Sequence, residues 1–190
     1  MAEMNSISRF FVNRSAARRS AKRYRWIREN VAIPKGAACL EIGCGNGAFA
    51  TRFVEGFRPE RYVATDLDPR QLKEATQELK KRFPNGLPAN LEFRPADMLH
   101  LPFPDASFTV VLTFVALHHA GPTHTDFTNV ADALSEIDRV LRPGGLLIYS
   151  ELFHKDLIRK WLAGHRYSIA AVQVRWRLES VAVQKFAGPG

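Results

Sequence analysis

The chain has 190 residues and a mass of 21.4 kDa, which suits one domain and is too short for two of ordinary size. With 46% hydrophobic and 24% charged residues, the composition excludes a disordered chain, a fibrous repeat and a disulfide-stapled miniprotein. No apolar run approaches the roughly 18 residues that a membrane-spanning helix needs, and we expect no signal peptide and no stable membrane insertion. The two cysteines, Cys39 and Cys44, are not spaced as a C-x-x-C pair, which favours a reducing, cytoplasmic environment.

The net charge of +8 is concentrated at the two ends of the chain. Residues 1–30 hold eight lysines and arginines against two acids, and residues 154–190 hold seven against two. Basic ends predict either contact with an anionic partner or an ordinary solvated surface. Ala17, Ala21, Tyr24, Ile27 and Val31 recur at helical spacing, so the first segment is predicted to be a basic amphipathic helix. We divide the chain into a basic helical lid or cap, residues 1–34, and a main domain, residues 35–190.

Short apolar runs alternate with helical patterns, which is typical of a wound α/β sheet. The apolar runs predict strands at residues 38–42, 61–66, 91–94, 108–114 and 146–151. Helices are expected at the residues that follow Gly47, at 68–83 with Asp68 as N-cap, at 126–141 with Asp126 as N-cap, and at 154–164. Residues 167–176 and 178–186 predict an antiparallel hairpin that closes the edge of the sheet.

The most informative segment is Cys39-Leu-Glu-Ile-Gly-Cys-Gly-Asn-Gly47. A strand that leads through a glycine-rich turn into a helix lets backbone amides approach a ligand closely. Asp66 follows about 20 residues later at the end of the next strand, where a carboxylate can accept hydrogen bonds from the hydroxyls of an adenosine ribose. Both NAD and S-adenosylmethionine satisfy this pattern. Glu41, inside the first strand, favours a cofactor with an amino-acid tail and a positive sulfonium.

Three further blocks follow in order: Asp97-Met98, the turn-rich Leu101-Pro-Phe-Pro-Asp-Ala-Ser-Phe108, and residues 134–145 ending in Arg-Pro-Gly-Gly. With the glycine turn they make residues 36–151 resemble class I S-adenosylmethionine-dependent methyltransferases. The resemblance is to the methyltransferase type 11 subset, which includes ubiquinone/menaquinone C-methyltransferases. It implies a Rossmann-like α/β fold with a seven-stranded, mostly parallel sheet of order 3-2-1-4-5-7-6 and helices on both faces.

The resemblance also implies a set of cofactor-binding residues: Glu41, Gly43, Gly45, Gly47, Asp66, Leu67, Asp97 and Met98. Glu41 and the three glycines would hold the methionine and ribose end, and Asp66 the ribose hydroxyls. Leu67 and Met98 would pack on the adenine. Asp97 would accept a hydrogen bond from the adenine amino group. The sequence departs from the family at Thr109, where an aspartate is common, so one polar support is missing.

Methyl transfer from a sulfonium is an in-line displacement, so the main task of such an enzyme is to position its reactants. His118 and His119 follow the fourth strand and are candidate bases for a hydroxyl or an acidic carbon. The alternative for each is a structural role at the strand end. His124 and Asp126 stand nearby, but a loop does not fix their geometry, and we expect no metal site.

Three classes of function remain open. The first is a methyltransferase for a small-molecule or lipid-like acceptor, with an aromatic lid over the sulfonium made of Phe10, Phe11, Tyr24 and Trp26. The second is an RNA methyltransferase, whose basic termini hold phosphates while bases stack on Tyr24, Trp26, Tyr167 and Trp176. The third is a cofactor-binding scaffold without activity. The acceptor atom and the oligomeric state stay open.

Overall fold

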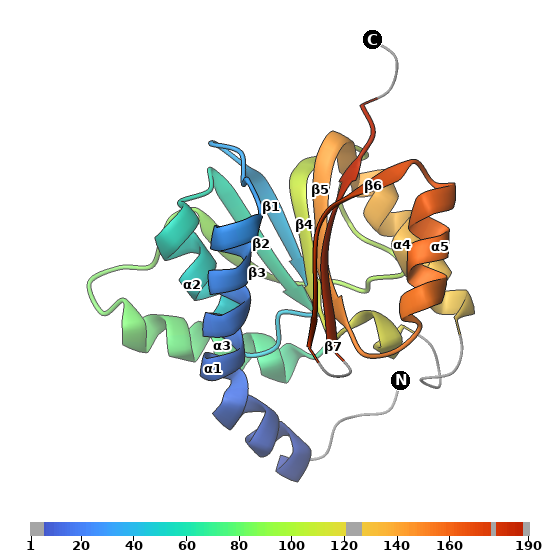
Figure 1. Ribbon diagram of the computed structural model, residues 1–190. Coiled ribbons are helices and arrows are strands. Elements are labelled where there is room, and N and C mark those ends of the chain that lie inside the picture. Colours follow the sequence, from blue (N-terminus) through green and yellow to red (C-terminus); the bar gives the residue numbers. More distant parts are fainter. Residues whose placement is uncertain (1–5, 121–126, 176–177, 188–190) are drawn as a thin grey trace.

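The computed structural model describes the backbone of residues 6–120, 127–175 and 178–187, and side chains within these ranges from residue 16 on. Seven strands form one sheet of order β3-β2-β1-β4-β5-β7-β6 (Figure 1). The strands are β1 (Ala38–Ile42), β2 (Arg61–Asp66), β3 (Leu91–Pro95), β4 (Phe108–Phe114), β5 (Leu141–Glu151), β6 (Tyr167–Arg175) and β7 (Leu178–Lys185). β7 runs antiparallel to both β5 and β6, and the other neighbours are parallel. The predicted strand order is therefore confirmed.

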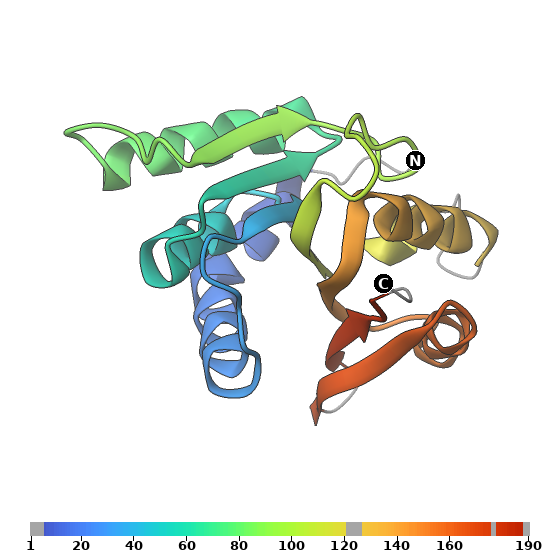
Figure 2. The ribbon, with the colours of Figure 1, turned by 90° about the horizontal axis from the view of Figure 1, so that it is seen from above.

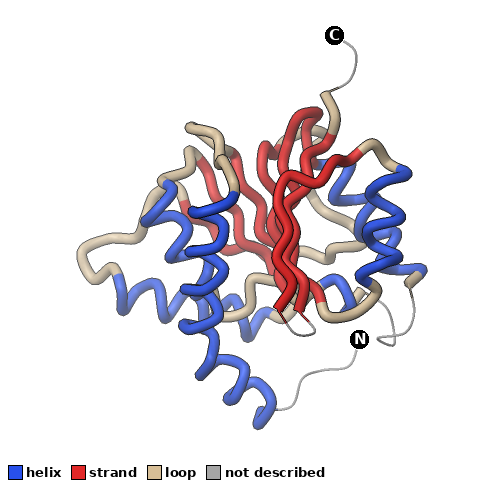
Figure 3. Tube along the Cα trace, in the orientation of Figure 1, coloured by secondary structure: helices blue, strands red, loops and turns tan. Residues whose placement is uncertain are grey.

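Helices connect the strands and lie on both sides of the sheet (Figure 3). They are α1 (Ser6–Asn30), α2 (Ala48–Phe57), α3 (Pro69–Arg82), α4 (Thr128–Val140) and α5 (Lys155–Gly164), with one short 3-10 turn, η1 (Leu117–His119). α3 begins as predicted: the Asp68 side chain accepts a hydrogen bond from the Arg70 amide at 2.9 Å, and Pro69 takes the first helical position. The predicted cap of α4, Asp126, lies outside the described residues.

The central strands β1, β2, β4 and β5 are buried on both faces, because helices cover each side of the sheet there (Figure 2), whereas β6 at one edge is largely exposed. α1, α2 and α3 pack on one face through an apolar cluster that includes Ile27, Phe53 and Leu72. α4 and α5 pack on the other through a cluster that includes Ile137 and Ile158. Strands buried on both faces consist of nearly continuous apolar residues, which is why the apolar runs predicted them well.

Two details differ from the sequence expectations. β5 begins at Leu141 rather than at residue 146, because Leu141 pairs with Phe108 and Leu146 pairs with Val110, leaving the intervening residues as an irregularity. Thr109 supplies a polar link at the position where the family commonly has aspartate. Its Oγ1 accepts a hydrogen bond from the Ala38 amide at 2.9 Å and donates one to the Ala38 carbonyl at 3.0 Å, which ties β4 to β1.

α1 is part of the core rather than an appendage. Trp26 and Ile27 are buried in the cluster beneath α2. The Ser20 hydroxyl donates to the Ala48 carbonyl at the start of α2 (2.9 Å), and the Tyr24 ring packs edge-on against Phe57 at its end. The two helices therefore run side by side. A division at residue 34 stays a prediction, but α1 and the sheet share one apolar cluster.

Candidate active site

The parallel strands end at the lower edge of the sheet in Figure 1, and we use the word crevice for the position at this edge where the ends of β1 and β4 meet. β1 is followed by β2 on one side, whereas β4 and β5 lie on the other, so the order of the strands reverses between β1 and β4. Connections that leave neighbouring strands in opposite directions create the ligand-binding crevice of open α/β sheets. The predicted site residues can be located relative to this point.

The glycine turn directly follows β1 and lines the crevice. Gly43, Gly45 and Gly47 all have positive φ angles, of 71°, 55° and 70°. A Cβ at Gly43 would lie 2.5 Å from the Cβ of Ala116, in the turn after β4, and a Cβ at Gly47 would lie 2.7 Å from the Phe93 ring. Only glycine combines a positive φ angle with the absence of a Cβ, so it alone fits at these positions. The turn therefore presents its backbone closely to a cofactor that approaches the main chain.

Asp66, the last residue of β2, organises this turn. Its Oδ2 accepts a hydrogen bond from the Gly45 amide at 2.8 Å, and its Oδ1 accepts one from the Asp68 amide at 3.0 Å. Burial raises the pKa of Asp66, and hydrogen bonds from the backbone of Asp68, Gly45 and Leu67 oppose that shift. A carboxylate has about four acceptor positions, so capacity remains for a ribose hydroxyl. The adjoining Leu67 side chain is 42% exposed, an apolar surface that an adenine ring would cover.

Asp97 and Met98 follow β3, at the next position along the same edge. The Ala96 amide donates to the Asp66 carbonyl at 3.2 Å, which places this turn beside the end of β2. Asp97 Oδ1 accepts a hydrogen bond from the Leu99 amide at 3.0 Å, and Met98 packs against the core on the α4 side. The structure therefore brings the residues assigned to the ribose and the adenine next to one another. Their role in binding stays a prediction.

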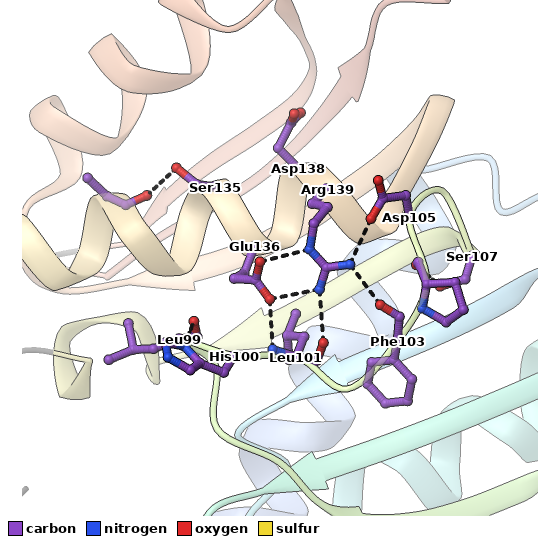
Figure 4. Close-up of polar contacts among 12 residues, drawn as sticks. Leu99, His100, Leu101, Phe103, Asp105, Ser107, Ser135, Glu136, Asp138 and Arg139 are labelled. Atoms are coloured by element: carbon purple, nitrogen blue, oxygen red, sulfur yellow. Dashed lines mark hydrogen bonds and ion pairs between the residues drawn. The ribbon is translucent and has the colours of Figure 1, made fainter.

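The loop after Met98 is fastened to α4 by Arg139 (Figure 4). The guanidinium donates to the carbonyls of Leu101 (2.9 Å) and Phe103 (2.7 Å), and it pairs with Glu136 at 2.8 Å. Glu136 in turn accepts a hydrogen bond from the Leu101 amide at 2.8 Å. The ion pair raises the pKa of Arg139 and lowers that of Glu136. Sequence reasoning missed this clamp, although the spacing of Glu136 and Arg139 on one predicted helix was a signal.

Glu41 is a buried carboxylate at the crevice, with 2% of its surface exposed. The Tyr62 hydroxyl donates to its Oε2 at 2.9 Å. Burial raises the pKa of Glu41 to about 8, although the Tyr62 hydrogen bond and the charge of Arg23 both act to lower it. Desolvation is the larger effect, so Glu41 binds a proton near neutral pH unless a cation arrives beside it.

Sequence reasoning missed Arg23, which reaches the crevice from α1. Its guanidinium lies 4.8 Å from the centre of the ring of Phe114, the last residue of β4. Burial lowers the pKa of Arg23 to about 10, whereas the charges of Glu41 and Glu151 raise it. A signal was available, since Arg23 falls on the same helical face as Ser20 and the buried Ile27.

The structure separates the two candidate bases. His118 is 5% exposed, and its Nδ1 lies 2.7 Å from Oε1 of Glu151, which is 1% exposed at the end of β5. His119 is exposed, with its ring 4.0 Å from that of His118. The Leu152 amide also donates to Glu151 Oε1 at 2.8 Å, whereas Oε2 has no hydrogen-bond partner within the described part of the chain. Sequence reasoning missed Glu151, although a carboxylate that ends an apolar strand was a signal.

Neutral His118 has one arrangement that suits this contact. The Nδ1–H donates to the Glu151 carboxylate, and the lone pair of the imidazole is then on Nε2. A carboxylate in this position fixes the ring orientation and stabilises the imidazolium that forms when Nε2 takes a proton. That His118 acts as a base stays a prediction, and its contact with Glu151 is the arrangement that such a base would need.

The proposed aromatic lid is wrong for the two rings that the structure describes. Trp26 is buried in the core, and Tyr24 packs on Phe57 at the far end of α2, because α1 runs alongside α2. The side chains of Phe10 and Phe11 lie outside the described residues, as does Trp176. Tyr167 is buried and donates to Asp138 at 2.8 Å, so neither Trp26 nor Tyr167 is available to stack on a nucleic-acid base.

Among the residues that the structure describes, no three His, Cys, Asp or Glu side chains come together in an arrangement that would hold a metal ion. His124 and Asp126 lie outside the described residues. None of the helices in the described ranges combines the length and the apolar character needed to cross a bilayer.

A family model and curated proteins both match the chain. The model of the methyltransferase domain family matches residues 40–149. Phthiotriol/phenolphthiotriol dimycocerosates methyltransferase 1 of Mycobacterium ulcerans (strain Agy99) is 35% identical over 128 residues, which cover 67% of this chain and 42% of that protein. The fatty-acid O-methyltransferase of Mycolicibacterium smegmatis (strain ATCC 700084 / mc(2)155) is 35% identical over 127 residues, which cover 67% and 41%. The alignment thus spans about two fifths of each relative.

Solved structures share the fold at low sequence identity. The [4+2]-cyclase SpnF has a TM-score of 0.75 at 17% identity, covering 92% of this chain and 82% of that chain. A SAM dependent methyltransferase from Aquifex aeolicus has a TM-score of 0.67 at 16% identity, covering 85% and 88%. These similarities confirm the Rossmann-like fold. Because a cyclase and a methyltransferase share it, the chemistry has to be argued from the site.

Proposed function

Since the chain belongs to the methyltransferase domain family, within the class I S-adenosylmethionine-dependent enzymes, we propose that it transfers a methyl group to the hydroxyl oxygen of a lipid-like alcohol. The observation on which this proposal depends is the buried His118–Glu151 pair beside the crevice (2.7 Å). A hydroxyl must lose a proton to become an effective methyl acceptor, and this pair provides a base for it.

The residues around the crevice fit S-adenosylmethionine better than a dinucleotide. The glycine cradle admits a close backbone contact, Asp66 retains acceptor capacity for a ribose, and Leu67 offers an apolar surface to adenine. A buried Glu41 offers a diphosphate no cation as partner, whereas its carboxylate form suits an ammonium group. When bound, S-adenosylmethionine supplies a methyl group on a positively charged sulfur, which an oxygen nucleophile displaces to leave a neutral thioether.

The protein side of the reaction is a proton transfer within a positioned pair. Glu151 accepts a hydrogen bond from the Nδ1–H of His118, which keeps the lone pair of the imidazole on Nε2. As the acceptor oxygen forms its new bond to carbon, Nε2 takes the hydroxyl proton, and the imidazolium is balanced by Glu151. His119 is exposed and takes no part in this scheme.

Two relatives support a lipid-like acceptor. One is named for phthiotriol and phenolphthiotriol dimycocerosates and the other for fatty acids. RNA receives no such support, because two of the rings that would stack on bases, Trp26 and Tyr167, are buried. A carboxylate acceptor is already ionised at neutral pH and would not need the His118–Glu151 pair, which is why we favour a hydroxyl.

The test combines product analysis with a matched pair of variants. Purified protein is incubated with methyl-labelled S-adenosylmethionine and either a long-chain alcohol, a fatty acid or RNA. We expect a methyl ether from the alcohol, a kcat reduced about 10²- to 10⁴-fold by His118→Asn, and little effect of the control His119→Asn. By calorimetry, both variants should bind S-adenosylhomocysteine with an affinity within twofold of that of the wild type.

Several outcomes would overturn the proposal. Full activity of His118→Asn would show that His118 is not the base. A methylated RNA product, formed with a steep dependence on salt, would indicate the RNA alternative. Tight binding of S-adenosylhomocysteine without turnover of any acceptor would indicate a scaffold.

A further inference from the structure

Two buried carboxylates face each other where β5 ends. Glu151, the last residue of β5, lies directly opposite Glu179 of β7 in the antiparallel register. The two residues are 1% and 3% exposed. Residues directly opposite in an antiparallel pair share a face of the sheet, with Cβ atoms about 5 Å apart. Two carboxylates in this position repel each other, so one of them takes up a proton unless positive charge compensates.

The structure places one basic group beside each carboxylate. The Arg159 guanidinium of α5 forms an ion pair with Glu179. His118 contacts Oε1 of Glu151 at 2.7 Å. α5 holds Arg159 in place, because the preceding residue, Ile158, is fully buried against the sheet. The proton-transfer pair of the proposed function therefore lies beside a second, oppositely charged pair.

The charge of Arg159 acts beyond its own ion pair. Burial raises the pKa of the Tyr149 hydroxyl to about 12, while the charge of Arg159 acts to lower it and that of Glu151 to raise it. Tyr149 lies two residues before Glu151 on β5 and so shares its face of the sheet. Glu151 Oε2 has no hydrogen-bond partner in the described part of the chain, so nearby charges contribute to keeping this carboxyl group ionised.

Other titratable or charged groups lie on the elements packed around the two pairs. In the described ranges they are His119 on η1, Tyr149 on β5, His154 at the start of α5 and Arg23 on α1. Arg23 stacks on Phe114 and approaches from the opposite face of the sheet. All of them stay the same when Arg159 or Glu179 is replaced, so their contributions cancel in a comparison of variants.

We propose that Arg159 and Glu179 are positioning residues of the proton-transfer pair, which act through Glu151 and set the pH above which His118 accepts a proton from the acceptor. Arg159 offsets Glu179, so His118 faces the net charge of one carboxylate rather than two. This inference deepens the proposed function and rests on it. Largely buried ion pairs add little stability compared with apolar residues, and a role beside the base accounts for this one.

The sign of each substitution follows from the net charge around the imidazole. Arg159→Gln removes a cation, so His118 and the two carboxyl groups together hold their proton to a higher pH. Glu179→Gln removes an anion and has the opposite effect. The double variant removes both charges and restores the net charge of the wild type. At an effective dielectric constant near 20, one charge at this range shifts such a titration by roughly one pH unit.

The experiment measures two titrations of the full chain. The first is the acid limb of kcat/KM against pH, with S-adenosylmethionine and hexadecanol as substrates. The second is an NMR titration of the imidazole and glutamate carboxyl groups in ligand-free protein, with the His118 signal assigned by comparison with His118→Asn. The proteins are wild type, Arg159→Gln, Arg159→Lys, Glu179→Gln, the double variant Arg159→Gln/Glu179→Gln and the control Lys160→Gln, which changes the exposed neighbour on α5.

We expect the acid limb to move up by roughly one pH unit in Arg159→Gln and down by a similar amount in Glu179→Gln. The double variant, Arg159→Lys and Lys160→Gln should stay within about 0.3 pH units of wild type. The NMR midpoints should move in the same directions. The double variant also leaves no buried charge without its partner, so it tests the inference even where Arg159→Gln alone folds poorly.

Three results would overturn the inference. An unchanged acid limb and unchanged NMR midpoints in Arg159→Gln would show that its charge does not reach the pair. A kcat lowered equally at every pH would mean that Arg159 only supports the fold of α5. A shift in Arg159→Gln that persists in the double variant would show that Glu179 is not the group that Arg159 offsets. Failure of the proposed function is recognised separately, because His118→Asn would then be fully active in the acceptor assay.

Discussion

The raised pKa of Glu41 makes a quantitative prediction about cofactor binding. In the free protein burial raises this pKa to about 8, so the carboxyl group is largely protonated at pH 6. An ammonium group is stabilised only by the carboxylate, so binding must release the proton. Below the pKa the apparent affinity for S-adenosylhomocysteine should fall about tenfold for each unit of pH.

This relation gives an affinity loss of roughly fifty- to a hundredfold between pH 7.5 and pH 5.5. The measurement is a calorimetric titration across that range with wild type and Glu41→Gln. The variant should bind more weakly at pH 7.5 and show a nearly flat profile, as should wild type with 5′-methylthioadenosine, which has no ammonium group. A flat wild-type profile, or an equal slope with 5′-methylthioadenosine, would refute the reasoning.

The same group affects folding with a definite sign. The folded-state pKa of Glu41 lies above its ordinary value of 4.5, so the folded protein holds this proton more tightly than the unfolded chain. The contribution of Glu41 to stability is therefore full below about pH 4.5 and is lost as the pH rises through about 8. Relative to Glu41→Gln, ligand-free wild type should lose stability across that window in denaturant titrations.

Two further predictions concern the turns around the site. Asp66→Ala removes the acceptor of the Gly45 and Asp68 amides and of the expected ribose hydroxyls, so S-adenosylhomocysteine should bind at least about a hundredfold more weakly; unchanged affinity by calorimetry would contradict the assignment. Arg139→Met breaks the clamp on the Leu101 and Phe103 carbonyls and should lower the free energy of unfolding by about 2 kcal/mol, or several degrees in Tm. The exposed Arg142→Met is its control, and equal melting of the two variants would show that the clamp adds no stability.

Local signals predicted what depends on local physics. The glycine turn, the positions of the central strands and Asp66 at the end of β2 follow from glycine backbone freedom and from apolar runs within a few residues of one another. The order of the strands, in contrast, came from the family resemblance. The start of β5 was misplaced, because pairing of Leu141 with Phe108 outweighs the turn signal of the following Pro-Gly-Gly.

The contacts that were missed join distant segments. Glu151 meets His118 across 33 residues, and Arg139 meets the Leu101 carbonyl across 38. The sequence of the first helix also does not reveal which side each residue faces. Tyr24 packs against α2, whereas its neighbour Arg23 faces the crevice. Such choices depend on how one helix is rotated against another, and helical spacing limits them without deciding them.

The attachment of α1 has a consequence for how this protein can be engineered. Because Trp26 and Ile27 fill the core and Arg23 stands over the end of β4, a cut after residue 30 would expose an apolar cluster as well as remove a charge. A chimaera that exchanges the first helix for that of a relative would have to carry α2 with it, since Gly56 leaves just enough room for the ring of Tyr24. The smallest transplantable unit is thus the pair of helices together with β1 and the glycine turn, which lie between them in the chain.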